Sequence, residues 1–289
     1  MITEEIRVQV NGMELAAKQW GDPELPAIIA LHGWLDNAAS YDRLAPALKN
    51  HRVIALDFAG HGYSGHRPEG VRYHTLDNVD DVIGLADALE LPQFILMGHS
   101  MGAGIATFTA GSFPERVTRL VLIEGIGSNT NPAEDAPRVL RKAVEDMKKT
   151  TAKRKPVYET RDDAIHTRAH AIGVISVDAS THICNRGLMP AGDGFTWRSD
   201  PRLKMSSAIR LTEDMVTAYL QKLTMPVLLV RGRHSFFATE KTLQNRADKI
   251  PGCQQVLLDG NHHLHLEQET FAPVAEAINA FLAGDRGVG

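Results

Sequence analysis

A serine with the neighbours of an enzyme nucleophile lies at position 100. Residues 94–104 read Phe-Ile-Leu-Met-Gly-His-Ser-Met-Gly-Ala-Gly, which predicts a buried strand, a tight turn and the start of a helix. Gly98 and Gly102 leave room for a sharp backbone turn that exposes the Ser100 hydroxyl beside the next backbone N–H. This arrangement predicts a serine nucleophile, whereas an ordinary glycine-rich turn is the alternative.

A serine hydroxyl needs a base within hydrogen-bond distance and a third group that orients the base. Where a serine nucleophile lies on such a turn, an acid and then a histidine follow it along the chain. Residues 260–265 (Gly-Asn-His-His-Leu-His) follow a predicted strand, so their histidines lie at a strand's carboxyl end, where catalytic groups gather in parallel sheets. We predict His262 as the base, with His263 as the alternative and His265 as a packed histidine.

Acyl transfer also needs N–H donors for the oxyanion. One is the backbone N–H of Met101, directly after the predicted nucleophile. The second is predicted at Trp34, because Gly33 allows the loop after strand 27–31 to turn the Trp34 N–H toward a reacting carbonyl oxygen. His32 is then a structural residue that braces this loop.

Short apolar runs alternate with segments of helical spacing over most of the chain. This alternation predicts an α/β fold with a mostly parallel sheet covered on both faces. Between 126 and 222 the alternation breaks, and we predict a helical cap there, above a core formed by 1–125 and 223–289. Strands are predicted at 6–10 and 15–20 (a hairpin around Asn11-Gly12), 27–31, 53–56, 94–97, 117–123, 226–230 and 255–258, core helices at 41–48, 76–89, 105–110, 240–247 and 271–282, and cap helices at 139–147, 163–174 and 213–220.

The composition narrows the class of protein. The 289 residues carry a net charge of −4, with 43% hydrophobic and 23% charged residues, so neither nucleic acid nor an anionic membrane is an expected partner. Two cysteines, Cys184 and Cys253, make no disulfide framework or metal-binding pair. Residues 1–5 lack the apolar core of a signal peptide, and we expect a cytoplasmic protein. The sequence does not indicate an oligomeric state.

Four segments, in their order along the chain, resemble landmarks of the α/β-hydrolase superfamily: 32–34, 57–64, 98–102 and 260–262. The sequences His-Gly-Trp-Leu-Asp-Asn at 32–37 and Gly-Asn-His-His-Leu-His at 260–265 are similar to its serine hydrolase-like branch. The resemblance implies an eight-stranded sheet, a helical cap at the insertion, and neither a metal nor an organic cofactor. It also makes 57–64 a structural loop, so His61 is not counted as catalytic.

The acid departs from the family pattern. Most members place an aspartate shortly after the strand that is here 226–230, but residues 231–237 contain no carboxylate, and Glu240 is the first to follow. An unpaired imidazolium in a partly buried site is unfavourable, so another acid is expected. Glu124 directly follows strand 117–123, and some haloalkane dehalogenases are similar in carrying their acid there. We predict Glu124; the alternatives are Glu240, a site without an orienting acid, and a Glu124 paired with a cap arginine.

These residues predict a serine hydrolase that cleaves a carboxylic ester of small to medium acyl chain through an acyl-enzyme on Ser100. Alternatives are C–C, thioester or lactone hydrolysis or acyl transfer with the same triad, and a catalytically weak ligand-binding relative. Dehalogenase and epoxide-hydrolase chemistry is disfavoured, because those enzymes carry an aspartate where Ser100 stands. Residues predicted to line an apolar substrate cleft, each with core or cap packing as the alternative, are Phe236, Phe237, Leu264 and Trp197.

Overall fold

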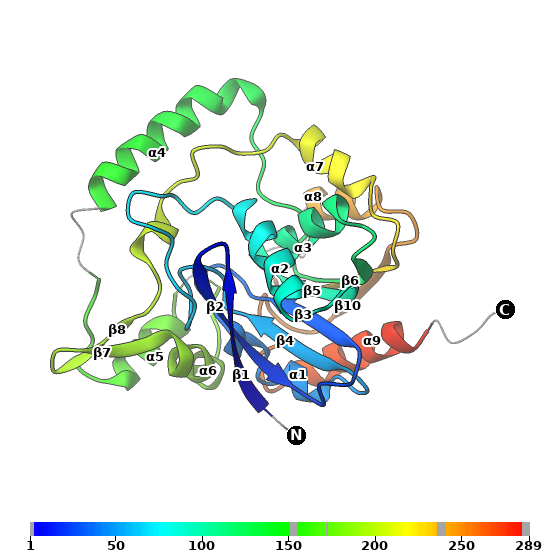
Figure 1. Ribbon diagram of the computed structural model, residues 1–289, viewed down its shortest axis with the longest axis horizontal. Helices are drawn as coiled ribbons and strands as arrows, with labels where there is room; N and C mark the ends of the chain where they lie inside the picture. The colour runs from blue at the N-terminus through cyan, green and yellow to red at the C-terminus, as the bar shows by residue number, and fades with distance from the viewer. Residues whose placement is uncertain (1–2, 151–154, 172, 236–240, 285–289) are drawn as a thin grey trace.

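An eight-stranded sheet in the order β1-β2-β4-β3-β5-β6-β9-β10 forms the centre of the molecule (Figure 1). The structure is a computed structural model that describes residues 3–150, 155–171, 173–235 and 241–284. From β4 to β10 neighbouring strands are parallel, whereas β1 and β2 are antiparallel additions at one edge. The predicted α/β fold with eight strands is confirmed. The strands are β1 (Thr3–Val10), β2 (Met13–Trp20), β3 (Ala27–Leu31), β4 (Arg52–Leu56), β5 (Phe94–His99), β6 (Val117–Ile123), β9 (Val227–Gly232) and β10 (Gln254–Leu258).

The edge hairpin forms where the sequence predicts it. Val10 pairs with Met13, so only Asn11 and Gly12 connect β1 to β2. Both turn residues have positive φ, +50° and +79°, which is the backbone of a type I′ turn and suits an Asn-Gly pair.

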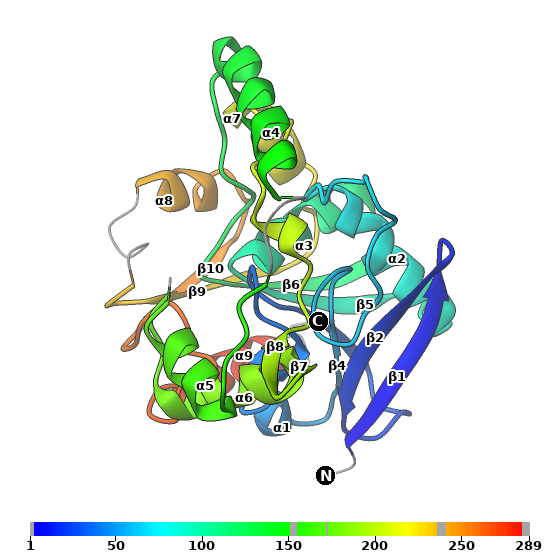
Figure 2. The same ribbon diagram turned by 90° about the vertical axis from the view of Figure 1, so that its left-hand side faces the viewer.

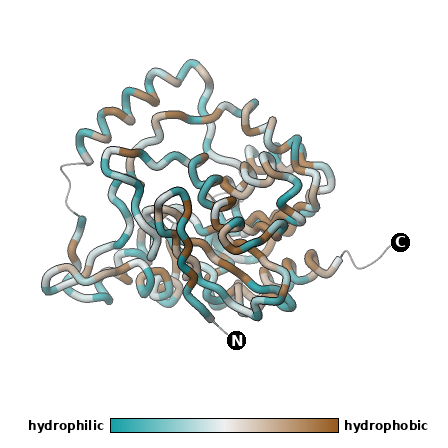
Figure 3. The backbone as a smooth tube through the Cα atoms, in the orientation of Figure 1, coloured by the Kyte–Doolittle hydropathy of each residue, from teal (hydrophilic) through white to brown (hydrophobic). Residues whose placement is uncertain are grey.

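Successive residues of the central strands face opposite layers of helices. In β3, Ile29 and Leu31 belong to the core on one face, whereas Ile28 and Ala30 belong to the core on the other. The first face is covered by α2 (Asp77–Ala88), α3 (Met101–Ser112) and α8 (Lys241–Ala247), and the second by α1 (Leu44–Ala47) and α9 (Phe271–Ala283) (Figure 2). Figure 3 shows the apolar residues concentrated in these central strands.

The insertion between β6 and β9 differs from the prediction in three places. It contains a hairpin of β7 (Leu188–Ala191) and β8 (Gly194–Trp197), where no strands were expected, and the helix predicted at 163–174 ends at Ala169. Helix α6, which was not predicted, carries few large apolar residues. The helices are α4 (Ala136–Thr150), α5 (Arg161–Ala169), α6 (Val177–Gly187) and α7 (Glu213–Leu220), with short 3₁₀ turns η2 (Ala133–Asp135) and η3 (Pro201–Lys204).

One core helix is also shorter than predicted. The segment 41–48 divides into a 3₁₀ turn, η1 (Ala38–Tyr41), and the four-residue α1. Pro46 prevents one continuous helix over 41–48, because its nitrogen cannot donate to the Asp42 carbonyl one turn earlier. Among the described residues, no helix is both long enough and apolar enough to cross a membrane.

Candidate active site

Ser100 lies on the turn between β5 and α3 in a strained backbone conformation. Its φ of +53° and ψ of −113° are rare for a residue with a side chain. The flanking glycines are required by close packing: a Cβ on Gly98 would lie 2.3 Å from the Gly102 carbonyl oxygen, and a Cβ on Gly102 would lie 2.1 Å from the Leu31 carbonyl oxygen. The turn therefore has the sharpness that the sequence predicts.

Ser100, His262 and Glu124 form a hydrogen-bonded chain. His262 Nε2 lies 2.9 Å from Ser100 Oγ, and His262 Nδ1 lies 3.0 Å from Glu124 Oε2. The three residues follow β5, β10 and β6, so the carboxyl ends of three parallel strands bring them together. In this geometry Nδ1 donates to the carboxylate and leaves Nε2 free to accept the hydroxyl proton.

The Glu124 carboxylate is held by donors from β9 and the turn that follows it. Glu124 is fully buried and has a positive φ of +56°. Its Oε1 accepts the Gly232 backbone N–H at 2.6 Å, and its Oε2 accepts the Ser235 hydroxyl as well as His262. The described partners of Glu124 are Gly232, Ser235 and His262, and no hydrogen bond to a cap arginine is found within the described parts of the chain. Glu240 lies outside the described residues.

Two backbone N–H groups suit an oxyanion. Met101 opens α3, so its amide lies beyond the hydrogen bonds of that helix. The Trp34 amide lies in the loop after β3, where a Cβ on Gly33 would come within 3.0 Å of His99 Nδ1. For neither amide does the described structure provide an acceptor. The Trp34 ring N–H donates to the Leu203 carbonyl in η3, 3.0 Å away.

Four histidines cluster behind the turn. The His99 ring lies 4.2 Å from the ring of His265 and 4.7 Å from that of His262, centre to centre. Burial and the neighbouring histidines lower the pKa of His99 and of His265 well below its usual value, so both rings are neutral. His99 Nε2 donates to the His262 carbonyl oxygen at 2.8 Å, and His265 bonds Ser40. His265 is therefore a packed structural residue, as predicted.

His263, the alternative base, has a different partner. Its Nε2 lies 3.0 Å from Asp36 Oδ2, and Arg168 of α5 lies 2.7 Å from Asp36 Oδ1. Burial opposes ionisation of Asp36, but Arg168 and His263 outweigh it and hold the pKa of this carboxyl well below its usual value. Asp36, His99 and His263 are close enough to suit a metal ion. The Arg168 guanidinium already supplies a cation to this group, so these residues do not fit a metal.

The loop after β3 is braced as the sequence predicts. His32 Nδ1 donates to the Gly33 carbonyl at 2.7 Å, and its Nε2 accepts the Phe58 N–H at 3.2 Å. Burial lowers the pKa of His32, in keeping with a neutral ring that both donates and accepts. Asp57 Oδ2 accepts a hydrogen bond from Arg186 Nε of α6 at 2.8 Å, and Asp57 Oδ1 accepts the Ala38 backbone N–H. His32 and the Asp57 loop thus have structural partners.

The predicted lining residues occupy different surroundings. Leu264 is fully buried in the core beside α1 and α9, so we assign it to packing and not to a cleft. Trp197 packs inside the insertion, where its ring N–H donates to the Tyr158 hydroxyl at 3.2 Å. Phe236 and Phe237 lie outside the described residues.

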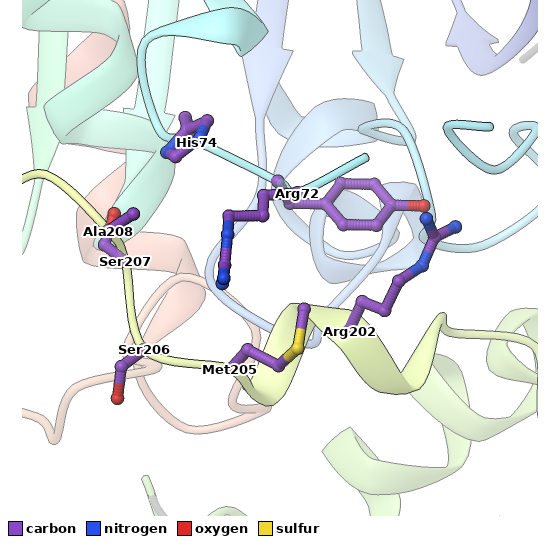
Figure 4. Close-up of a pocket in the computed structure, with 8 residues that line it drawn as sticks. Arg72, His74, Arg202, Met205, Ser206, Ser207 and Ala208 are labelled. Carbon is purple, nitrogen blue, oxygen red and sulfur yellow. The ribbon is translucent and has the colours of Figure 1, made fainter. Parts of the chain in front are cut away.

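A pocket lies where the insertion meets the segment before α2 (Figure 4). The Arg202 guanidinium there is bound by Asp200 and by the Arg67 carbonyl oxygen, and Arg72 donates to the Ala143 carbonyl oxygen at 3.1 Å. These bonds join the insertion to the core. Neither Ser100 nor His262 lines the pocket, so it is separate from the candidate active site.

Sequence reasoning missed several residues around the triad. Ser235, His99 and Arg168 all contact a predicted site residue or its neighbour. For Ser235 a signal was available, because it follows a predicted strand at the edge where catalytic groups gather. For Arg168 no comparable signal exists, since its partner Asp36 is 132 residues away.

Comparisons with known proteins agree with this architecture. The family model described as alpha/beta hydrolase fold matches residues 26–269. A serine hydrolase-like protein of Dictyostelium discoideum is 34% identical over 281 residues, which span 91% of this chain and 78% of that protein.

A crystal structure of a hypothetical protein from Pseudomonas aeruginosa PAO1 is 42% identical, with a TM-score of 0.94 over 97% of this chain and 99% of that one. A thioesterase domain from the curacin biosynthetic pathway is 25% identical, with a TM-score of 0.84 over 96% and 99%. The chain belongs to the α/β-hydrolase fold family, and serine hydrolase-like proteins are among its relatives.

Proposed function

We propose that this protein is a serine hydrolase in which Ser100 is the nucleophile, His262 the base and Glu124 the acid. The observation that carries the proposal is the continuous hydrogen-bonded chain, with 2.9 Å from Ser100 Oγ to His262 Nε2 and 3.0 Å from His262 Nδ1 to Glu124 Oε2. This arrangement supplies the nucleophile, the base and the orienting group that acyl transfer requires.

In the proposed reaction, His262 Nε2 takes the Ser100 hydroxyl proton as Oγ attacks the ester carbonyl carbon. The backbone N–H groups of Trp34 and Met101 bind the resulting oxyanion. His262 then gives the proton to the departing alkoxide, the carbon–oxygen bond of the ester breaks, and an acyl-Ser100 ester remains. Water, activated by the same imidazole, releases the acid and restores Ser100. Glu124 keeps the imidazole oriented and stabilises its protonated form.

The proposed substrate is a small-molecule carboxylic ester of small to medium acyl chain. A thioester is the second candidate, favoured by the similarity to a thioesterase domain at a TM-score of 0.84. Both substrates pass through the same acyl-Ser100, so the fold does not choose between them. Matched butyryl ester and butyryl thioester substrates test the choice: the ester is expected to give the higher kcat/KM, and the opposite ranking would assign a thioesterase.

We also propose that residues 126–222 are a cap on a core of 1–125 and 223–289. The insertion leaves the sheet at the end of β6 and returns to the adjacent strand β9, beside the triad. It also reaches the proposed oxyanion loop, through the bond from the Trp34 ring to Leu203 in η3. These contacts support a role for the insertion in shaping access to Ser100.

The nucleophile and the acid can be tested together. Ser100→Ala is expected to abolish hydrolysis of p-nitrophenyl butyrate and covalent labelling by a fluorophosphonate, because no alkoxide forms. Glu124→Gln is expected to keep labelling at a slower rate and to lower kcat about ten-thousandfold, as the matching amide substitution does in a serine triad. Labelling that persists in Ser100→Ala would remove the nucleophile assignment. Unchanged kcat in Glu124→Gln would remove the acid.

A further inference from the structure

We propose that Ser235 is a positioning residue for the Glu124–His262 pair. Its hydroxyl donates to Glu124 Oε2, the oxygen that faces His262 Nδ1. This inference rests on the proposed function, since it assigns a role within that same triad.

The Glu124 carboxylate depends on protein donors, because it has no exposed surface. Oε1 accepts the Gly232 N–H at 2.6 Å, and Oε2 accepts the Ser235 hydroxyl and His262 Nδ1. An ionised carboxylate in a buried site is stable only when its oxygens are hydrogen-bonded. Of these three donors, all among the described residues, two belong to β9 and its following turn. The Glu124 side chain, which follows β6, is therefore held in part by the adjacent strand.

The two donors from this turn have different tasks. The Gly232 amide lies in the parallel pairing of β9 with its neighbours and fixes one carboxylate oxygen. Ser235 lies in the turn closed by the bond from its own N–H to the Gly232 carbonyl, 3.2 Å away. Its hydroxyl thereby sets the position of the second oxygen relative to the imidazole. Without it, His262 is the one donor to Oε2 among the described residues, and the carboxylate is held less firmly about its last side-chain bond.

The orientation of His262 depends on contacts at its backbone as well as at its ring. Its backbone carbonyl is held by His99 at 2.8 Å, and its ring is held by Glu124 at 3.0 Å. Losing the Ser235 hydroxyl weakens only the second contact. The expected consequence is a misplaced imidazole in the transition state, with substrate binding unchanged.

The main test compares Ser235→Ala with Ser235→Thr on p-nitrophenyl butyrate, with rates normalised to active sites titrated by fluorophosphonate. Ser235→Ala is expected to lower kcat about tenfold and to change KM less than about twofold, because a bond to a charged group is lost. Ser235→Thr keeps a hydroxyl and is expected to recover kcat to within about threefold of wild type. Thermal unfolding of each variant shows whether it is folded at the assay temperature.

Ser180→Ala is the matched control. Ser180 is a buried serine of α6 whose hydroxyl donates to the Ile165 carbonyl oxygen at 2.7 Å, within the insertion. Its loss removes a buried hydroxyl without touching the triad, so kcat is expected to stay at the wild-type value.

A double variant decides whether Ser235 acts through Glu124. If it does, Ser235→Ala in the Glu124→Gln background lowers kcat less than about threefold, because the carboxylate that it positions is already gone. A full tenfold loss in that background, or wild-type kcat in Ser235→Ala, overturns the inference. The proposed function fails by a different result, namely turnover and labelling that survive in Ser100→Ala.

Discussion

At the residue scale, chemistry converges on one edge of the sheet because parallel strands end there. Ser100, Glu124 and His262 follow three different strands, yet their side chains meet at 2.9 and 3.0 Å. Ser100 and His262 could be predicted from motifs that are local in sequence. The contact between Glu124 and Ser235 joins residues 111 positions apart, and only the pairing of β6 with β9 makes them neighbours. Local sequence patterns therefore identify Glu124 as a candidate acid, but they do not identify the groups that donate hydrogen bonds to it.

Gly125 provides a prediction at this scale. A Cβ at Gly125 would lie 2.7 Å from the Ser100 carbonyl oxygen and 3.1 Å from the Ala103 side chain. Gly125→Ala is therefore expected to displace the Ser100 turn and to lower kcat by about tenfold or more, since small shifts of reacting groups reduce rates strongly. The measurement is kcat on p-nitrophenyl butyrate.

Gly284→Ala is the control for this variant. Its nearest neighbour to an added Cβ is the Ala280 carbonyl oxygen at an ordinary 3.5 Å, so activity and stability should stay at wild-type values. Equal kcat in Gly125→Ala and wild type would mean that the turn tolerates the added methyl group.

At the element scale, the core of the fold could be predicted closely and the insertion only in part. The core strands carry continuous apolar runs, and β3 and β6 have the bounds that the sequence predicts. The hairpin of β7 and β8 was missed although its connection, Gly192-Asp193, is a typical turn pair with Gly192 at a φ of +58°. Helix α6 was also missed; apart from Ile183, its buried residues are small or polar. Short elements that pack on one another depend on tertiary contacts more than on pattern.

Two buried arginines attach the helices of the insertion to the core. Arg168 of α5 binds Asp36 in the loop after β3, and Arg186 of α6 binds Asp57 in the loop after β4. Both loops lie beside the proposed active site: Asp36 follows Trp34, and the Asp57 loop contacts His32 through the Phe58 N–H. The insertion is thereby fixed to the same segments that shape the oxyanion loop.

Removing Arg168 should destabilise the protein strongly. Arg168→Met removes the guanidinium that neutralises the buried Asp36 carboxylate, and breaking such a pair typically costs about 3–5 kcal/mol. The double variant Asp36→Asn/Arg168→Met is expected to recover part of this loss, because no unpaired charge then remains. Urea unfolding measures both.

An exposed ion pair serves as the control for this cycle. Arg141 and Glu145 lie one turn apart on α4 with largely exposed side chains. Arg141→Met should change stability little, because water and salt screen such pairs. If Arg168→Met also left the free energy of unfolding nearly unchanged, the contact of α5 with Asp36 would not contribute to stability.

At the scale of the whole molecule, the interior is unusually rich in neutral imidazoles. His32, His61, His99 and His265 are all buried, and burial lowers the pKa of each, that of His61 to about 3. Two of them brace the loop after β3, and two pack behind the Ser100 turn. The surroundings of the proposed active site are thus formed by rings that must stay uncharged in the folded state.

This condition predicts how stability depends on pH. In the unfolded chain these four histidines bind protons below about pH 6.5, whereas in the folded protein their lowered pKa values keep them neutral. The unfolded state then binds more protons, so the free energy of unfolding falls as pH drops below about 6.5, by up to about 1.4 kcal/mol per pH unit for each ring.

Urea unfolding at pH 7.5, 6.0 and 5.0 measures this slope. His61→Gln is expected to reduce the slope by up to the amount that corresponds to one proton. A slope that is the same in His61→Gln and wild type would show that His61 takes up its proton without unfolding.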